Sequence, residues 1–190
     1  VNLITGATTL GRTDTPQALE IDDQALHNVL GPGYRMLLIG AGTLTEYLAT
    51  MAIFNGFVVT ICDTRQEYMD SLQIQGVQRS ALMPDDAVTA FRPDLRSCVI
   101  ALSHDPKLDD LALLEAMQGP AFYDGAIGSH RNAHSRRERM QEHFGVSPDT
   151  LARLHSPAGL SIGSKTPAEI AVSIMAQVIA HKNGSLGTNA

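Results

Sequence analysis

The chain has 190 residues, of which 44% are hydrophobic and 18% are charged, and its formal net charge is −6. This composition supports one sizeable hydrophobic core and excludes a disordered chain. The acidic balance excludes a broad nucleic-acid surface, since such a surface needs clustered lysine and arginine. No apolar run approaches the ~20 residues of a membrane helix, so we expect neither nucleic acid nor membrane as a partner.

The beginning of the chain has the least regular pattern. We interpret residues 1–33 as a linker or N-terminal arm, with a short helix over residues 21–30 that Gly31-Pro32-Gly33 ends. A regular pattern runs from residue 34 to residue 184, and we expect residues 185–190 to be a disordered tail.

From residue 34 onwards, apolar runs alternate with segments of helical spacing. The runs predict buried strands at residues 36–39, 57–62, 97–102 and 121–127, with a shorter strand at 73–77. Helices are predicted after the first strand, from Pro84 to Phe91, from Pro106, from about residue 130 to 143, and from Thr166. This alternation predicts an α/β protein: a three-layer αβα Rossmann-like fold with a mainly parallel sheet.

Two cysteines, Cys62 and Cys98, lie inside apolar runs. They lack CxxC spacing, and no secretory signal precedes them. We therefore expect two reduced core thiols and a cytoplasmic protein.

The turn after the first strand has the strongest ligand-binding pattern. Gly40 permits a tight turn, and Gly42 lets the backbone approach a pyrophosphate closely. The following helix offers free amides and a partial positive charge. The predicted contacts in this turn are Gly40, Ala41, Gly42, Thr43 and Leu44.

The second strand ends at Asp63, where a dinucleotide-binding fold places the acid that grips ribose hydroxyls. We include Thr64 and Arg65 with it. Arg65 is either a contact for an additional phosphate or a solvated side chain.

Polar side chains also follow the next two strands. Ser103, His104 and Asp105 come where ligands bind in open α/β sheets, and His104 suits phosphate binding or acid–base work. Asp105 is equally a helix N-cap, with Pro106 as the first helical residue.

The next strand end carries Gly128, Ser129 and Arg131, and Ser129 suits either a helix cap or an anion. The four arginines that begin at Arg131 suit a small anionic ligand better than DNA; the others are Arg136, Arg137 and Arg139. His130 and His134 have the spacing of a metal pair on a helix, but no third ligand is evident. We expect a polar surface there and no metal.

The segment before the last helix matches two motifs that its context contradicts. Residues 159–163 read GxSxG, but the helix begins only at Thr166, so Ser161 is not a nucleophile. Residues 159–166 lie one residue from a Walker A motif, yet no convincing strand precedes them. Thr166, Pro167 and Glu169 predict a capping box.

Taken together, these segments resemble the C-terminal Rossmann domain of the XdhC/CoxI family, the xanthine dehydrogenase accessory factors. The matching segments are the turn at Gly40, His104-Asp105, residues 123–129, 136–140, 155–163 and 165–171. The resemblance implies a non-catalytic chaperone that binds a molybdopterin-type cofactor, the molybdenum cofactor, and serves a xanthine or aldehyde dehydrogenase.

The resemblance also implies partners. They are the apo-enzyme of a molybdenum hydroxylase, a cysteine desulfurase or cytidylyltransferase, and a second copy in a homodimer. Two alternatives stay open: an NAD(P)-dependent oxidoreductase, and a nucleotide-sensing regulatory domain. The chain has no Tyr-x-x-x-Lys, which leaves His104 as the candidate acid for the first alternative.

Overall fold

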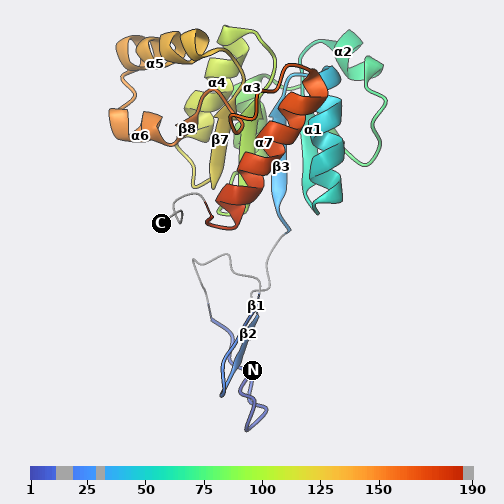
Figure 1. Cartoon of the computed structure of the whole chain (residues 1–190), viewed down its shortest axis with the longest axis vertical. Helices are drawn as coiled ribbons and strands as arrows, with labels where there is room; N and C mark the ends of the chain where they lie inside the picture. The colour runs from blue at the N-terminus through green and yellow to red at the C-terminus, as the bar shows by residue number, and fades with distance from the viewer. Residues whose placement is uncertain (12–18, 29–32, 186–190) are drawn as a thin grey trace. The chain divides into compact units, whose positions relative to one another are not determined.

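A computed structural model of the chain describes residues 1–11, 19–28 and 33–185 (Figure 1). The chain divides into two compact units, Val1–Gly33 and Tyr34–Ala190. In the part of the chain that is described, no helix is long and apolar enough to cross a membrane.

The first unit contains an antiparallel hairpin of β1 (Leu19–Ile21) and β2 (Leu26–Asn28). Between the strands, the Asp22 carboxylate accepts hydrogen bonds from the amides two and three residues later, at 2.8 and 2.7 Å. An Asp side chain that bonds its own backbone in this way favours a turn over a helix. The helix predicted over residues 21–30 is therefore wrong for 21–28, and its last two residues lie outside the described residues.

The second unit is built on one six-stranded sheet in the order β5-β4-β3-β6-β7-β8, and all its neighbouring strands are parallel. The strands are β3 (Arg35–Ile39), β4 (Val58–Cys62), β5 (Gln78–Ser80), β6 (Ser97–Ala101), β7 (Tyr123–Ala126) and β8 (Leu154–His155). The helices are α1 (Thr43–Phe54), α2 (Gln66–Ser71), α3 (Pro84–Phe91), α4 (Pro106–Ala116), α5 (His130–Phe144), α6 (Pro148–Ala152) and α7 (Pro167–Lys182). The predicted α/β Rossmann-like fold is confirmed.

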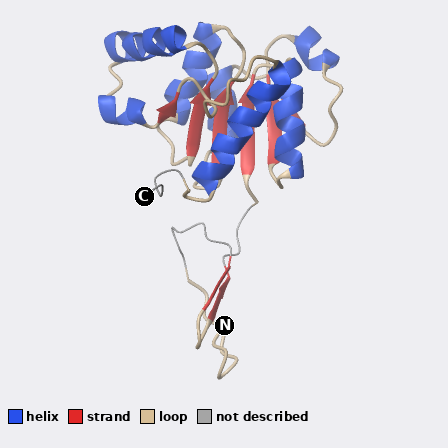
Figure 2. Ribbon diagram, viewed as in Figure 1, coloured by secondary structure: helices blue, strands red, loops and turns tan. Residues whose placement is uncertain are grey.

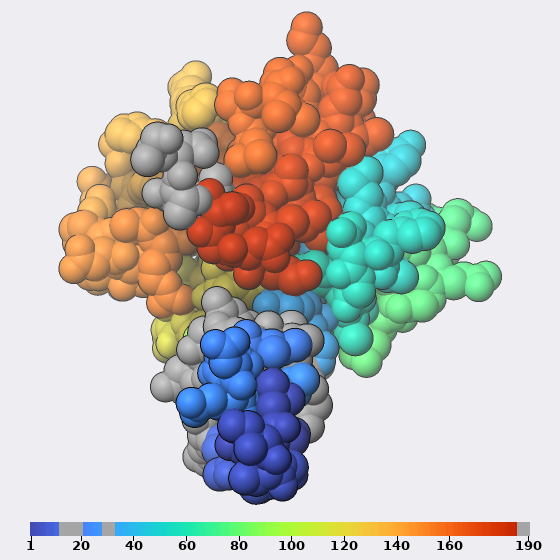
Figure 3. Space-filling view, turned by 60° about the horizontal axis from the view of Figure 1, so that its bottom comes forward, coloured from blue at the N-terminus to red at the C-terminus, as the bar shows by residue number. Residues whose placement is uncertain are grey.

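Helices cover both faces of this sheet (Figure 2). Helices α1 and α7 pack against each other on one face, and α3 packs against α4 on the other. Figure 3 shows α7 beside α1 at the surface.

The sheet separates the core by the two-residue period of its strands. Met36 and Leu38 face the α1–α7 side, whereas Leu37 and Ile39 face the α3–α4 side. All four side chains are buried, as the continuous apolar run predicts.

The two cysteines are buried and free, which confirms their place in the core. Burial raises the pKa of the Cys62 thiol to about 11, and it raises the pKa of the Cys98 thiol well above its usual value.

Two strands differ from the sequence prediction. The strand expected at residues 73–77 is a loop, and pairing begins at Gln78, opposite Thr60. The loop residues Ile74 and Val77 are hydrophobic because their side chains pack on the core, and not because they belong to a strand. Strand β8 has two residues, and no apolar run in the sequence predicts it.

Candidate functional site

A cavity of about 580 Å³ lies beyond the carboxyl ends of β3, β6 and β7. Along the chain, successive strands run outward in one direction from β3 to β5 and in the other from β6 to β8. This reversal between β3 and β6 leaves the crevice in which open α/β folds bind ligands. We call it the strand-end cavity.

Four segments and one helix line the strand-end cavity. They are the start of α1, the β6–α4 loop, the β7–α5 turn with the start of α5, the loop before α7, and α7 itself. The lining residues are Leu44, His104, Ile127, Gly128, Ser129, His130, Asn132, Pro157–Ser164, Ile170 and Ser173. Of the residues predicted from sequence, Leu44, His104, Gly128 and Ser129 are brought together here.

Gly40 and Gly42 have different roles in the first turn. Gly40 has a φ of 102°, and a Cβ there would lie 2.6 Å from the Ser103 Cα, so the close approach of two loops requires glycine. Gly42 is extended, and a Cβ there would meet nothing within 4 Å. Gly42 is also the N-cap of α1 and supplies no side chain, so packing does not explain its identity.

Asp63 lies at the end of β4, and its side chain is 1% exposed. Its carboxylate accepts hydrogen bonds from the Ala41 amide at 2.8 Å and from the Arg65 amide at 2.9 Å. It also accepts from Arg65 Nε at 2.9 Å and Nη2 at 2.8 Å. Burial acts to raise the pKa of Asp63, but the hydrogen bonds from Arg65 and Ala41 outweigh it and hold that pKa below its usual value.

The β6–α4 loop holds His104 in a left-handed conformation, with a φ of 63°. Asp105 accepts a hydrogen bond from the Lys107 amide at 2.9 Å, which confirms it as the N-cap of α4. The Ser103 hydroxyl donates to Asp109 at 2.6 Å and so does not face the cavity as a free donor. The loop therefore presents the exposed His104 to the cavity and uses the residues on either side to hold it there.

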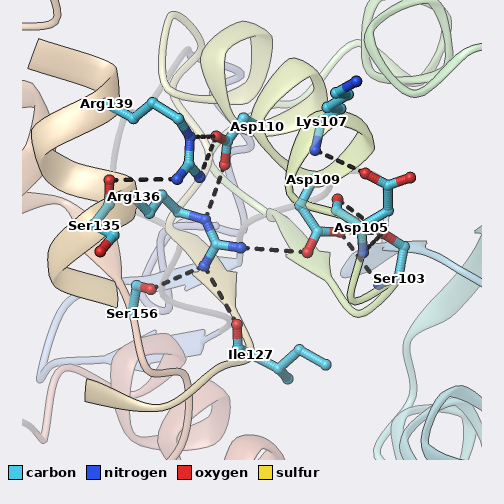
Figure 4. A network of polar contacts seen from close by, with 10 residues as sticks. All are labelled: Ser103, Asp105, Lys107, Asp109, Asp110, Ile127, Ser135, Arg136, Arg139 and Ser156. Carbon is cyan, nitrogen blue, oxygen red and sulfur yellow. Dashed lines mark hydrogen bonds and ion pairs between the residues drawn. The ribbon is translucent and has the colours of Figure 1, made fainter. Parts of the chain in front are cut away.

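A buried ionic network lies behind the cavity wall (Figure 4). Arg136 donates to Asp109 at 3.3 Å and to Asp110 at 3.0 Å, and Arg139 donates to Asp110 at 2.6 Å. Arg136 also donates to the carbonyl of the cavity residue Ile127 at 3.3 Å. Burial raises the pKa of Asp109 despite the nearby Ser103 hydroxyl and Arg136.

This network reassigns most of the basic cluster predicted to suit an anionic ligand. Arg136 is 4% exposed and is bonded within the fold. Arg139 is also bonded within the fold, through Asp110. Arg137 donates to the carbonyls of Ser156 and Leu154 at 2.9 and 3.1 Å. Only the exposed Arg131 keeps the predicted role open. The paired acids on α4 were the sequence signal for this network, but nothing local connected them to α5.

The β7–α5 turn places small and polar groups at the cavity. Gly128 has a φ of 145°, and Ser129 caps α5 by accepting from the Asn132 amide at 3.2 Å. His130 lines the cavity, whereas His134, one turn further along α5, does not line it and pairs with Glu138 at 3.2 Å. Among the described residues, no three His, Cys, Asp or Glu side chains gather to hold a metal ion.

The loop before α7 forms the remaining wall and is fixed by α7. Gln177 accepts from both the Tyr123 hydroxyl and the Gly159 amide at 2.7 Å. A Cβ at Gly159 would collide with the Ser173 hydroxyl, so this loop depends on glycine to approach α7. Thr166 and Glu169 form the predicted capping box. Ser161 lies in the loop and not at a strand–helix turn, so residues 159–163 do not form a nucleophile elbow.

Comparison with known proteins identifies the domain. Residues 36–178 match the family model described as the XdhC Rossmann domain. A probable xanthine dehydrogenase subunit from Bacillus subtilis (strain 168) is 30% identical over 149 residues, which cover 78% of this chain and 43% of that protein. The molybdenum cofactor insertion chaperone PaoD from Escherichia coli (strain K12) is 24% identical over 147 residues, or 77% of this chain and 40% of that protein.

A solved structure agrees with these matches. The crystal structure of a xanthine dehydrogenase from Bacillus halodurans superimposes with a TM-score of 0.69 at 26% identity, covering 88% of this chain and 47% of that one. The chain spans less than half the length of the curated relatives that it matches. Because the family model matches most of the chain, the chain belongs to the XdhC family through its Rossmann domain.

Proposed function

We propose that this domain binds the molybdenum cofactor, as molybdopterin or its cytosine dinucleotide, in the strand-end cavity. Its role is that of an accessory chaperone in the maturation of a xanthine or aldehyde dehydrogenase-type molybdoenzyme. Membership of the XdhC family supports this proposal, as does the similarity to a protein named as a molybdenum cofactor insertion chaperone. The redox chemistry of the bound cofactor belongs to the enzyme that receives it.

The observation that carries the proposal is the strand-end cavity itself. Its volume of about 580 Å³ falls within the roughly 300–1,000 Å³ of small-molecule sites. Its walls fit a phosphorylated heterocycle. They offer the start of α5, the hydroxyls of Ser129 and Ser161, the imidazoles of His104 and His130, and apolar surface at Leu44 and Ile170.

Within this site we assign contacts by position. His104 and the β7–α5 turn at Gly128 and Ser129 would hold the polar groups of the cofactor, because they line the cavity. Arg131, in the exposed first turn of α5, would balance a phosphate charge there.

The proposal is tested by titrating the purified chain with molybdopterin under anaerobic conditions. We expect saturable binding at micromolar concentrations. His104→Asn should weaken it by about tenfold, because Asn tolerates the left-handed backbone but lacks the imidazole. His134→Asn is the matched control, since His134 does not line the cavity. No binding at tens of micromolar, or equal losses in the two variants, would count against the site.

A second pair of variants tests the cavity by filling it. Ser161→Phe places a ring in the loop that lines the cavity, and Ser135→Phe places the same ring on the exposed face of α5. We expect only Ser161→Phe to reduce cofactor affinity. Equal melting temperatures in the two variants would show that the loss is steric.

The proposed partner is the apo-enzyme of a molybdenum hydroxylase, as the names of the relatives suggest. Capture of that apo-enzyme by the cofactor-loaded chain, and not by the Ser161→Phe variant, would support a chaperone. Hydride transfer from NADH to carbonyl substrates would instead favour the oxidoreductase alternative.

A further inference from the structure

At the end of β4, the side chains of the residues that follow the strand bond to one another. A carboxylate has about four lone-pair positions, and Asp63 receives four hydrogen bonds, one from the Ala41 amide and three from Arg65. The Arg65 guanidinium is held a second time, because it lies 3.8 Å from the centroid of the Tyr68 ring. We call Asp63 and Arg65 the β4 pair.

The β4 pair occupies the position that matters for a nucleotide. In dinucleotide-binding Rossmann folds, the acid at the end of the second strand accepts hydrogen bonds from the ribose hydroxyls. Here a ribose would have to displace Arg65 from a side chain that is 1% exposed. The lost charge-assisted hydrogen bonds make this displacement unfavourable.

The position of the cavity is an independent observation. Its lining residues come from α1, from the loops after β6 and β7, and from the segment leading into α7. None of them comes from β4, from α2, or from the β4 pair. This cavity therefore lies on the β6–β7 side of β3, opposite the half in which an adenosine would lie.

We propose that the β4 pair is a specificity determinant that closes the adenosine half-site, so that the cavity takes a compact phosphorylated heterocycle and rejects NAD(P). This inference rests on the proposed function and narrows it: molybdopterin fits as the compact ligand, and no ribose is held at the end of β4. Arg65 acts here as a positioning residue, because it acts through Asp63 and does not contact the ligand.

The experiment is calorimetric titration of the full chain with NADH, NADPH and molybdopterin. We expect the wild type to give no saturable heat with either nucleotide. Arg65→Met keeps an unbranched side chain but removes the guanidinium, and with it two of the four hydrogen bonds to Asp63, which frees those two acceptor positions for a ribose diol. We expect NADH affinity to rise by at least about tenfold in this variant, while molybdopterin affinity stays within about twofold.

Arg92→Met is the matched control, since Arg92 is an exposed arginine at the end of α3 that does not line the cavity.

Two results would overturn the inference. One is micromolar binding of NADH or NADPH by the wild type that Asp63→Asn abolishes. The other is an unchanged NADH affinity in a folded Arg65→Met variant. If Arg65→Met does not fold, the wild-type nucleotide titrations still decide. If the wild type did not bind molybdopterin, the proposed function would be contradicted, but the nucleotide titrations would still test the inference about the β4 pair.

Discussion

At the carboxyl edge of the sheet, a fully bonded acid lies on one side of β3 and a cavity lies on the other. On the β4 side, the buried Asp63 receives four hydrogen bonds from Arg65 and Ala41. On the β6–β7 side, the comparable loops stand apart around a cavity of about 580 Å³. The glycine turn lies between the two sides. A glycine turn therefore does not by itself locate the cavity in this fold, because the side chains on either side of it are arranged differently.

The two sides also differ in how their buried acids are satisfied. Asp124, on β7, is 1% exposed, and neither of its oxygens has a hydrogen-bond partner among the described residues. Its nearest cation is Arg153, at 3.9 Å. Burial raises the pKa of Asp124 to about 7, whereas the pKa of Asp63 is lowered. The β6–β7 side thus has an ionic network behind the cavity wall and a weakly compensated acid on β7.

The largest expected effect comes from breaking the network on the β6–β7 side. Arg136→Met leaves Asp109 and Asp110 buried without their shared cation. We expect a loss of about 3–5 kcal/mol in the free energy of unfolding, measured by urea denaturation. The control is Arg131→Met on the exposed face of the same helix, with an expected change below about 0.5 kcal/mol. Similar midpoints for the two variants would show that the network does not stabilise the fold.

The second expected effect is a pH dependence of opposite sign on the two sides. The raised pKa of Asp124 stabilises the fold below about pH 4, and this contribution is lost as pH rises towards about 7, by up to about 4 kcal/mol. Asp124→Asn should therefore remove a fall in stability between pH 4 and pH 8.

The lowered pKa of Asp63 has the reverse consequence. Its contribution is present above the usual carboxyl pKa and is lost as pH falls through the lowered value. Asp63→Asn should thus cost stability at pH 7 and progressively less in acid. Unfolding free energies measured across this pH range test both variants. Parallel curves for the wild type and Asp124→Asn would contradict the assignment for the β6–β7 side.

The smallest expected effects separate the two glycines of the turn. Gly40→Ala forces a Cβ against the Ser103 backbone at a φ of 102°, and we expect a loss of about 2–3 kcal/mol. Gly42→Ala meets open space, and we expect a change within about 1 kcal/mol. Thermal and urea unfolding measure the difference. Equal losses would mean that the two glycines share one structural role.

The features predicted correctly from sequence rest on contacts between residues close in the chain. The caps at Asp105, Ser129 and Thr166 each bond an amide two or three residues away. The apolar run at β3 and its following turn are equally local. The family was recognised from short segments in the same way, and the family model over residues 36–178 confirms it.

The features that sequence reasoning missed join residues that are distant in the chain. Arg136 meets Asp109 and Asp110 across 27 and 26 positions, and Gln177 meets Tyr123 across 54. Strand β8 is too short to carry a pattern. The hairpin turn at Asp22 is an exception, since its bonds are local and the predicted helix overlooked them.

The sequence by itself determined the central strands β3, β4, β6 and β7, the helices α1, α3, α4, α5 and α7, and the family, because periodicity and capping act over a few neighbouring residues. The tertiary structure alone decided that the Asp63 carboxylate accepts hydrogen bonds from Arg65 and Ala41. It also decided that most of the basic cluster is bonded within the fold and that the cavity lies beyond β6 and β7. The physical reason is that a buried charge must find its partner in space, and sequence patterns do not carry the distances between elements that fix which partner it finds.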